Sequence, residues 1–462
     1  MITKKWPWLA LAALLALILP AQAVEIVNND AFGLDVYGRE QMLGVLENVP
    51  DPYRDHNRLY LFQKQARIGF KGHYEDAFRY DAQFAFGGED ANGSNTDLSL
   101  LDFVADVPLD FGPKGTILKI GQFRVPYSRE GLTDQGYALF TSRSIANLGS
   151  YQSRDYGLAL LAASGKWTGT LGTFSSGGRD VPQRFLPERL GVPYLAARFG
   201  YNDGVDEDIY HVVGTDDHLT RTTKAAYFDA IYMQDTLIGH SSALQVRTID
   251  KNLLVDSGFN PYIGAGPGDT AANTANMQRG NLYWLGGDAV LRHPLGVGSA
   301  LEGEIEANWG GYQNRYGVIH LANARVQGDY RVGRFAVGLR YAVLSMDTKS
   351  GFLSTAKAGP PQILGPVVNN DLGTAIHEIT PSLSWHFRGN HMKIVADLPV
   401  TLNCPIWYDN IGKGTEAAPT PLGAYAFPDP TATTQNSVLA TKGNGTARRT
   451  VVEARMLFQF MF

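Results

Sequence analysis

The chain has 462 residues, with 45 acidic and 40 basic side chains and a net charge of −5. This acidic balance argues against a nucleic-acid-binding protein, which would carry an excess of basic residues. The single cysteine, Cys404, excludes a small disulfide scaffold and disfavours a cysteine-based metal site, and we expect neither metal nor cofactor.

The first 23 residues have the pattern of a secretory signal peptide. Lys4 and Lys5 precede an apolar run over 9–19, and Ala21-Gln22-Ala23 forms an A-x-A cleavage site. The run is too short to span a hydrocarbon core, which needs about 20 apolar residues. Removing this segment leaves 38 basic and 45 acidic side chains, a net charge near −7. We therefore expect one exported domain over 24–462.

Apolar and polar residues alternate with a period of two along most of the remaining chain, which predicts β-strands. The pattern is clearest over 65–74, 78–86, 301–309, 321–331 and 334–343. The polar positions that we expect to line a lumen are Arg67, Lys71, Glu302, Glu304, Glu306, Arg325, Arg331 and Arg340.

Run length and spacing favour a membrane barrel over a soluble sandwich. The runs are longer than the usual 5–6 residues of soluble strands and near the 9–11 that a tilted membrane strand needs. Short connections alternate with long ones near 126–152, 235–280, 347–375 and 404–448, as in outer-membrane barrels. We predict an all-β, antiparallel transmembrane β-barrel of about 16 strands. The expected strands are 32–46, 59–75, 77–88, 98–109, 115–125, 154–163, 166–175, 193–202, one within 207–250, 281–292, 299–311, 318–331, 334–346, 376–388, 391–402 and 450–462.

The stretch 204–250 contains three strand-like runs, over 209–214, 225–235 and 243–249, and the pattern does not decide which of them enters the wall.

The last run, 450–462, alternates strictly and ends on Phe462. An amphipathic last strand with a terminal phenylalanine resembles the signal by which the barrel assembly machinery recognises outer-membrane barrels. An exposed aromatic strand of this kind would promote aggregation in a soluble protein. We therefore predict a bacterial outer-membrane location, with membrane lipid and lipopolysaccharide around the barrel.

Residues 119–160 contain a strand, a long insertion and the entry to the next strand. The strand ends in Gly121-Gln122-Phe123-Arg124-Val125-Pro126-Tyr127, where Pro126 stops the sheet ladder. Phe140-Thr141-Ser142-Arg143-Ser144 lies within the insertion, and Arg154-Asp155-Tyr156-Gly157 opens the next strand. We expect a short helix within 132–147, capped by Ser128 or Thr133.

These three motifs resemble the phosphate-selective porin O and P family. The resemblance implies a 16-stranded porin, often a homotrimer, whose third outer loop folds into the lumen and whose basic side chains select anions. Arginine suits this role because its planar fork donates paired hydrogen bonds to phosphate-like oxygens. The candidate anion-binding residues at the constriction are Arg124, Arg129, Arg143 and Arg154.

Other readings remain open. The acidic row Glu302-Glu304-Glu306 and the net charge favour a general, non-selective or cation-tolerant pore over strict phosphate selectivity, and Arg325 and Arg331 suit ion pairs with that row. A structural barrel or barrel enzyme is a second alternative, although no G-x-S-x-G or H-E-x-x-H motif occurs and we expect no enzyme. A secreted soluble β protein is the third.

Overall fold

The structure is a computed structural model. The expected signal peptide and most of the long connections predicted near 235–280, 347–375 and 404–448 lie outside the described residues. The described residues are 24–50, 55–86, 98–113, 115–150, 154–175, 193–207, 209–210, 219–237, 246–247, 253–255, 279–314, 317–347, 375–407 and 446–462.

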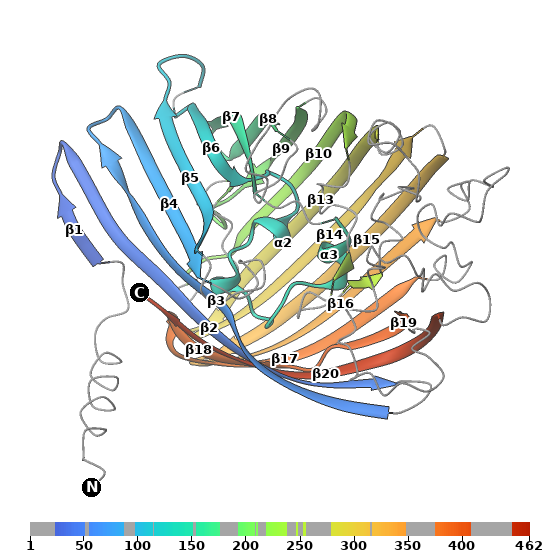
Figure 1. Ribbon diagram of the computed structural model, residues 1–462. Coiled ribbons are helices and arrows are strands. Elements are labelled where there is room, and N and C mark those ends of the chain that lie inside the picture. The colour runs from blue at the N-terminus through green and yellow to red at the C-terminus, as the bar shows by residue number, and fades with distance from the viewer. Residues whose placement is uncertain are drawn as a thin grey trace, which may run out of the picture.

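Most of the described chain forms one antiparallel sheet that closes on itself (Figure 1). The first half of the sheet contains β1 (Val24–Asn28), β2 (Phe32–Pro50), β3 (Asp55–Tyr74), β4 (Phe78–Phe86), β5 (Leu98–Pro108), β6 (Ile117–Arg124), β7 (Arg154–Ser164), β8 (Trp167–Phe174) and β9 (Tyr194–Asn202). The second half contains β10 (Thr223–Leu237), β13 (Arg279–Gly296), β14 (Ser299–Asn314), β15 (Gly317–Val332), β16 (Phe335–Asp347), β17 (Ile376–Asn390), β18 (Met392–Asp397), β19 (Val400–Trp407) and β20 (Thr446–Met461).

The wall has sixteen strands in the described part of the chain. Both β18 and β19 pair with β17 on one side and β20 on the other, so they are two halves of one wall strand. The short β1 pairs only with the start of β2, beyond the end of β20. The predicted transmembrane barrel of about 16 strands is therefore confirmed, strand for strand.

The side chains of the wall have the arrangement of a membrane barrel. On β14, Leu301 and Ile305 are exposed on the outer face, whereas Glu302, Glu304 and Glu306 are buried on the inner face. A soluble sandwich would bury the apolar row and expose the charged one. Lipid, by contrast, favours apolar side chains outside and tolerates charge only in the lumen. The soluble alternative is therefore wrong for this fold.

The uncertain stretch 204–250 contributes one wall strand. This strand, β10, contains the run 225–235 and pairs with β9 and β13. Ile209 and Tyr210 belong instead to the apolar cluster inside the barrel. Residues Val246–Arg247 (β11) and Leu253–Val255 (β12) form a separate two-stranded sheet.

The barrel closes where the last residue meets β2. The backbone N–H of Gly38 donates to the carbonyl of Phe462 (2.9 Å), and that of Phe462 donates to the carbonyl of Gly38 (3.0 Å). A Cβ atom on Gly38 would lie 2.5 Å from the Phe462 ring, so the glycine leaves room for the terminal aromatic side chain. The end of the barrel that contains Val24 and Phe462 is called the terminal end below.

Three short helices lie inside the ring of strands, in the connection between β6 and β7 (Figure 1). They are α2 (Arg129–Leu132), η2 (Gln135–Tyr137) and α3 (Ile145–Ser150). None of the helices among the described residues is long and apolar enough to cross a membrane. The connection 125–150, called the constriction loop below, therefore occupies the lumen, as predicted for the third outer loop.

Gly121, in the motif that precedes this loop, is predicted to be intolerant of a side chain. Its φ of +130° lies in the region open mainly to glycine, and an added Cβ would lie 2.0 Å from the carbonyl oxygen of Phe103. We expect Gly121→Ala to destabilise the β5–β6 pair by about 1–3 kcal/mol from backbone strain alone. The fraction of folded, heat-modifiable barrel on gels measures this. Gly303→Ala on β14, where a Cβ meets nothing within 4 Å, is the matched control, and equal folding of the two variants would contradict the prediction.

Candidate pore constriction

The constriction loop turns inward directly after β6. Pro126 ends the strand because it offers no N–H to the ladder. Val125, Tyr127 and Leu132 then pack in an apolar cluster with wall residues such as Trp284. This packing keeps the loop inside the barrel.

Ser128 has a left-handed backbone conformation at the start of the loop. Its φ of +67° is unusual for a residue with a side chain and costs on the order of 1–3 kcal/mol. Local contacts hold this conformation: the Ser128 N–H donates to Asp229 (2.5 Å) and the hydroxyl donates to Glu306. The hydroxyl also accepts from the Gly131 N–H (3.1 Å), so Ser128 caps α2 as predicted.

The expected short helix within 132–147 is present only in part. After α2 and its C-cap Thr133, the 3-10 turn η2 covers Gln135–Tyr137, and α3 begins only at Ile145. The backbone between them is used for contacts with the wall: the Thr141 N–H donates to Asp397 (2.7 Å) and the Ala138 carbonyl accepts from Lys393 (2.7 Å). A continuous helix would use these groups internally.

Arg129, one of the four predicted anion-binding residues, is fully buried. Its Nη1 and Nη2 donate to Asp206 (3.1 and 2.7 Å), and its Nε donates to Asp288 (2.7 Å). All three side chains are at most 1% exposed. In this structure Arg129 therefore anchors the loop instead of facing the lumen.

Arg154 and Arg124 lie at the rim of the loop, on the terminal side. Arg154 makes a two-bond pair with Asp102 (2.8 Å each). Arg124 lies 3.6 Å from Asp134, and Arg39 from β2 pairs with the same carboxylate. Both predicted arginines line a large cavity while they are held by carboxylates.

Asp134 is held in its charged form by this arrangement. Burial raises its pKa, but the guanidinium groups of Arg39, Arg124 and Arg67 outweigh burial and hold the pKa well below its usual range. The contribution of Asp134 to loop stability is therefore complete above the ordinary carboxyl pKa, about 3.9, and is lost only as the pH falls through the lowered value.

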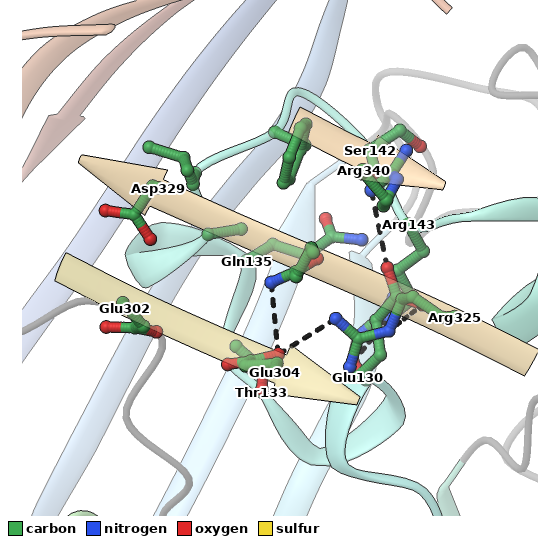
Figure 2. Close-up of a pocket in the computed structure, with 14 residues that line it drawn as sticks. Glu130, Thr133, Gln135, Ser142, Arg143, Glu302, Glu304, Arg325, Asp329 and Arg340 are labelled. Carbon is green, nitrogen blue, oxygen red and sulfur yellow. Dashed lines mark hydrogen bonds and ion pairs between the residues drawn. The ribbon is translucent and has the colours of Figure 1, made fainter. Parts of the chain in front are cut away.

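Glu130 links the loop to the wall opposite β6 (Figure 2). Its carboxylate lies 3.4 Å from both Arg325 and Arg340, which also pair with Glu304 (2.8 Å) and Glu378 (2.7 Å) respectively. Arg325 further contacts Glu306 at 2.9 Å, so the expected pairing with the glutamate row is present for Arg325. Arg331, for which the same pairing was expected, lines the larger cavity described below.

Arg143 faces a small cavity of about 40 Å³ between the loop and β14–β16 (Figure 2). Its guanidinium donates to the carbonyls of Glu130 (3.1 Å) and Gly131 (3.3 Å). The ionisable residues around this cavity are Glu130, Glu302, Glu304 and Asp329 against Arg143, Arg325 and Arg340.

A much larger cavity, of about 1000 Å³, opens below the loop at the terminal end and is called the vestibule below. Nine Lys or Arg residues line it against four Asp or Glu. If Asp106, which pairs with Lys119, is counted with the acidic residues, the basic residues still exceed the acidic ones by four. The basic residues are Arg39, Arg67, Lys71, Lys119, Arg124, Arg154, Arg331, Arg334 and Arg388, and the acidic ones are Asp81, Asp102, Asp134 and Glu207.

Sequence reasoning missed the acidic partners of the loop. Glu130 and Asp134 lie close in sequence to the predicted arginines, and this proximity is the only sequence feature that could have indicated them. The sequence around Asp206 and Asp288 did not indicate that they bind Arg129. The three residues are far apart in the chain, and only the closed barrel brings them together.

One serine–histidine pair bears on the enzyme alternative. Ser384 Oγ lies 2.9 Å from His386 Nε2, but Ser384 is only 1% exposed, so its hydroxyl is closed to a substrate in this structure. The described residues contain no group of three or more His, Cys, Asp or Glu placed to hold a metal ion.

A closed sixteen-stranded wall, apolar outside and charged inside, with a loop folded into its lumen defines the class of porin-type β-barrels. The sequence model of the family "Phosphate-selective porin O and P" matches residues 47–193, which confirms the resemblance over that segment. No curated protein sequence matches the chain.

Solved porin-type barrels share the fold. An anion-selective porin from Comamonas acidovorans superposes with a TM-score of 0.52 at 13% identity, covering 93% of this chain and 100% of that one. OmpT, an outer membrane protein of Vibrio cholerae, has a TM-score of 0.50 at 10% identity, covering 95% and 100%. At these identities the likeness establishes the fold alone.

Ser128→Ala is predicted to weaken the docking of the loop. The change removes the α2 cap and the hydroxyl bond to Glu306. We expect the free energy of unfolding in detergent, measured with a chemical denaturant, to fall by about 1–2 kcal/mol. Ser164→Ala at the exposed end of β7 is the control and should change it little. Equal stabilities of the two variants would show that the cap does not hold the loop.

Proposed function

We propose that the chain is an outer-membrane porin through which small hydrophilic solutes diffuse passively, with a preference for anions such as phosphate. The observation that carries this proposal is the vestibule, where basic residues exceed acidic ones around about 1000 Å³ of space. Solutes in a cleft with one sign of charge and low-dielectric walls experience a focused field, which raises the local concentration of the opposite charge. Rings of Arg and Lys are a common basis of anion selection in pores.

The constriction contributes differently from the vestibule. The four predicted anion-binding arginines are engaged to different degrees: Arg129 is buried, Arg124 and Arg154 are held by carboxylates at the vestibule, and Arg143 lines the small cavity. We infer that Arg124, Arg143 and Arg154 act on passing anions through their field, because each lines a cavity and their carboxylate or carbonyl partners hold them in place.

A general, cation-tolerant pore is the second candidate. The small cavity beside the loop supports it, because acidic groups outnumber basic ones there by one. Cations that pass the vestibule would meet this acidic patch beside the constriction loop. Ion selectivity distinguishes the two candidates.

The surroundings of the barrel remain predictions. The exposed apolar rows suit membrane lipid and lipopolysaccharide around an outer-membrane barrel. Phe462, at the closure of the barrel, suits a signal for the assembly machinery. The homotrimer implied by the family resemblance is testable by cross-linking in native membranes.

The purified protein in a planar bilayer is predicted to give stepwise, ohmic conductance. In a KCl gradient the reversal potential should have the sign of anion preference, because of the basic vestibule. Added phosphate should reduce the chloride current if the lumen binds phosphate. A reversal potential of the opposite sign favours the cation-tolerant pore, and the absence of conductance from folded, heat-modifiable protein would refute the porin proposal.

Two variants are predicted to locate the selectivity. Lys71→Gln/Arg334→Gln removes two positive charges from the vestibule, whereas Arg143→Ala removes one from the small cavity. We expect each to shift the reversal potential towards zero, and the vestibule variant to shift it further because it removes more charge. Lys166→Ala, on the exposed turn after β7, is the control. Unchanged potentials in both variants would show that these charges do not select.

A further inference from the structure

One connection at the terminal end departs from its neighbours. Most of the turns there are tight, as at 165–166, 297–298 and 333–334, but the connection between β9 and β10 extends over 203–222. Its described residues 205–206 and 209–210 are buried inside the barrel. A segment from the end opposite the origin of the constriction loop therefore reaches into the same lumen.

Local hydrogen bonds set the inward course of this segment. The Asn202 side chain accepts from the N–H groups of Val205 (2.9 Å) and Asp206 (3.2 Å) and donates to the Asp206 carbonyl (2.8 Å). Such an Asx turn reverses the chain directly after the strand. The reversal directs Asp206 into the barrel.

Asp206 of this segment meets the constriction loop through a buried ion pair. The carboxylate of Asp206 accepts hydrogen bonds from both terminal nitrogens of Arg129, and both side chains are 0% exposed. Asp288 of β13 binds both the Nε of Arg129 and Nη2 of Arg198, each at 2.7 Å. Asp229 accepts a hydrogen bond from the Ser128 N–H and forms an ion pair with Arg198 at 2.6 Å.

A second set of contacts holds the segment against the wall. The Val205 carbonyl accepts from Arg292 (3.2 Å). Tyr210 packs edge-on against Phe123, with ring centroids 5.6 Å apart, and the ammonium of Lys119 lies 5.2 Å from its ring. Phe123 belongs to the strand end from which the loop departs, so the segment touches both the base and the first helical turn of the loop.

We propose that the buried residues 205–206 and 209–210 form a tether that positions the constriction loop from the terminal end, with Asp206 and Arg129 as its positioning pair. This inference rests on the proposed pore function. A bidentate pair in a dry site has one favoured geometry, so it holds the loop in a single arrangement. Without it, the loop keeps its wall contacts but loses the restraint on the α2 turn, and the pore alternates between conducting and restricted states.

Single-channel recording of the full protein tests the tether. Asp206→Asn keeps the size of the side chain but removes its charge, and it leaves two arginines facing two aspartates, so we expect the barrel to fold. Closing events should become at least on the order of tenfold more frequent, the effect of weakening a charge-assisted hydrogen bond on a two-state population. Asp206→Glu, which restores the charge, should return closing towards the wild-type rate.

Asp203→Asn is the matched control in the same connection. Asp203 pairs with Lys166 (2.6 Å) and Arg221 (3.4 Å), whose side chains are 54% and 60% exposed, so this variant should record like the wild type. Steady wild-type current from folded Asp206→Asn barrels overturns the tether but leaves the porin proposal intact. A wild-type protein without current overturns the porin proposal instead.

A second variant covers the case in which Asp206→Asn does not fold. Arg129→Lys keeps the buried charge but replaces the fork by a single point donor. Frequent closures from folded Arg129→Lys barrels support the tether. Steady current, or failure of this variant to fold as well, shows that the pair serves barrel assembly and overturns the positioning role.

Discussion

The structure depends on one constraint: a backbone in lipid has no water to satisfy its N–H and carbonyl groups, so every strand must pair on both sides. Closure between β2 and β20 meets this requirement, and the reciprocal bonds of Gly38 and Phe462 complete it at the last residue. Closure also forces alternation, because one face of each strand then meets lipid and the other meets an enclosed lumen. The charged interior follows from the closed wall.

A charged lumen packed with a loop must neutralise itself wherever water is excluded. This explains why the arginines nearest the loop are paired: Arg325 and Arg340 share Glu130, and Arg129 is enclosed by Asp206 and Asp288. Charge that remains in excess is found where the lumen widens, in the vestibule. Arginine at the constriction thus holds the loop in shape, while the proposed anion preference depends mainly on the excess positive charge of the vestibule.

The fold was predictable from sequence because its signal is local. The alternation over 301–309 and the final run to Phe462 can be read from consecutive residues, and each residue keeps its face throughout a regular strand. The site was predictable only in part. Its arginines stand in a recognisable motif, but whether an arginine faces solvent depends on partners such as Asp206, 77 positions away. The expected helix within 132–147 is limited to η2 and the start of α3 for a related reason, because the distant wall residues Asp397 and Lys393 bind the backbone groups between them.

Ser128 shows how these levels connect. A residue with a side chain occupies φ +67° only where its surroundings outweigh the strain, and here Asp229 and Glu306 from two wall strands do so. Asp229 is in turn bound by Arg198, which reaches Asp288 and through it Arg129, the residue next to Ser128. The turn that starts the constriction loop is therefore held by connected ion pairs whose wall residues belong to β9, β10 and β13. We therefore expect a change of Arg198, Asp229 or Asp288 in these strands to alter the turn at Ser128, although none of the three belongs to the loop.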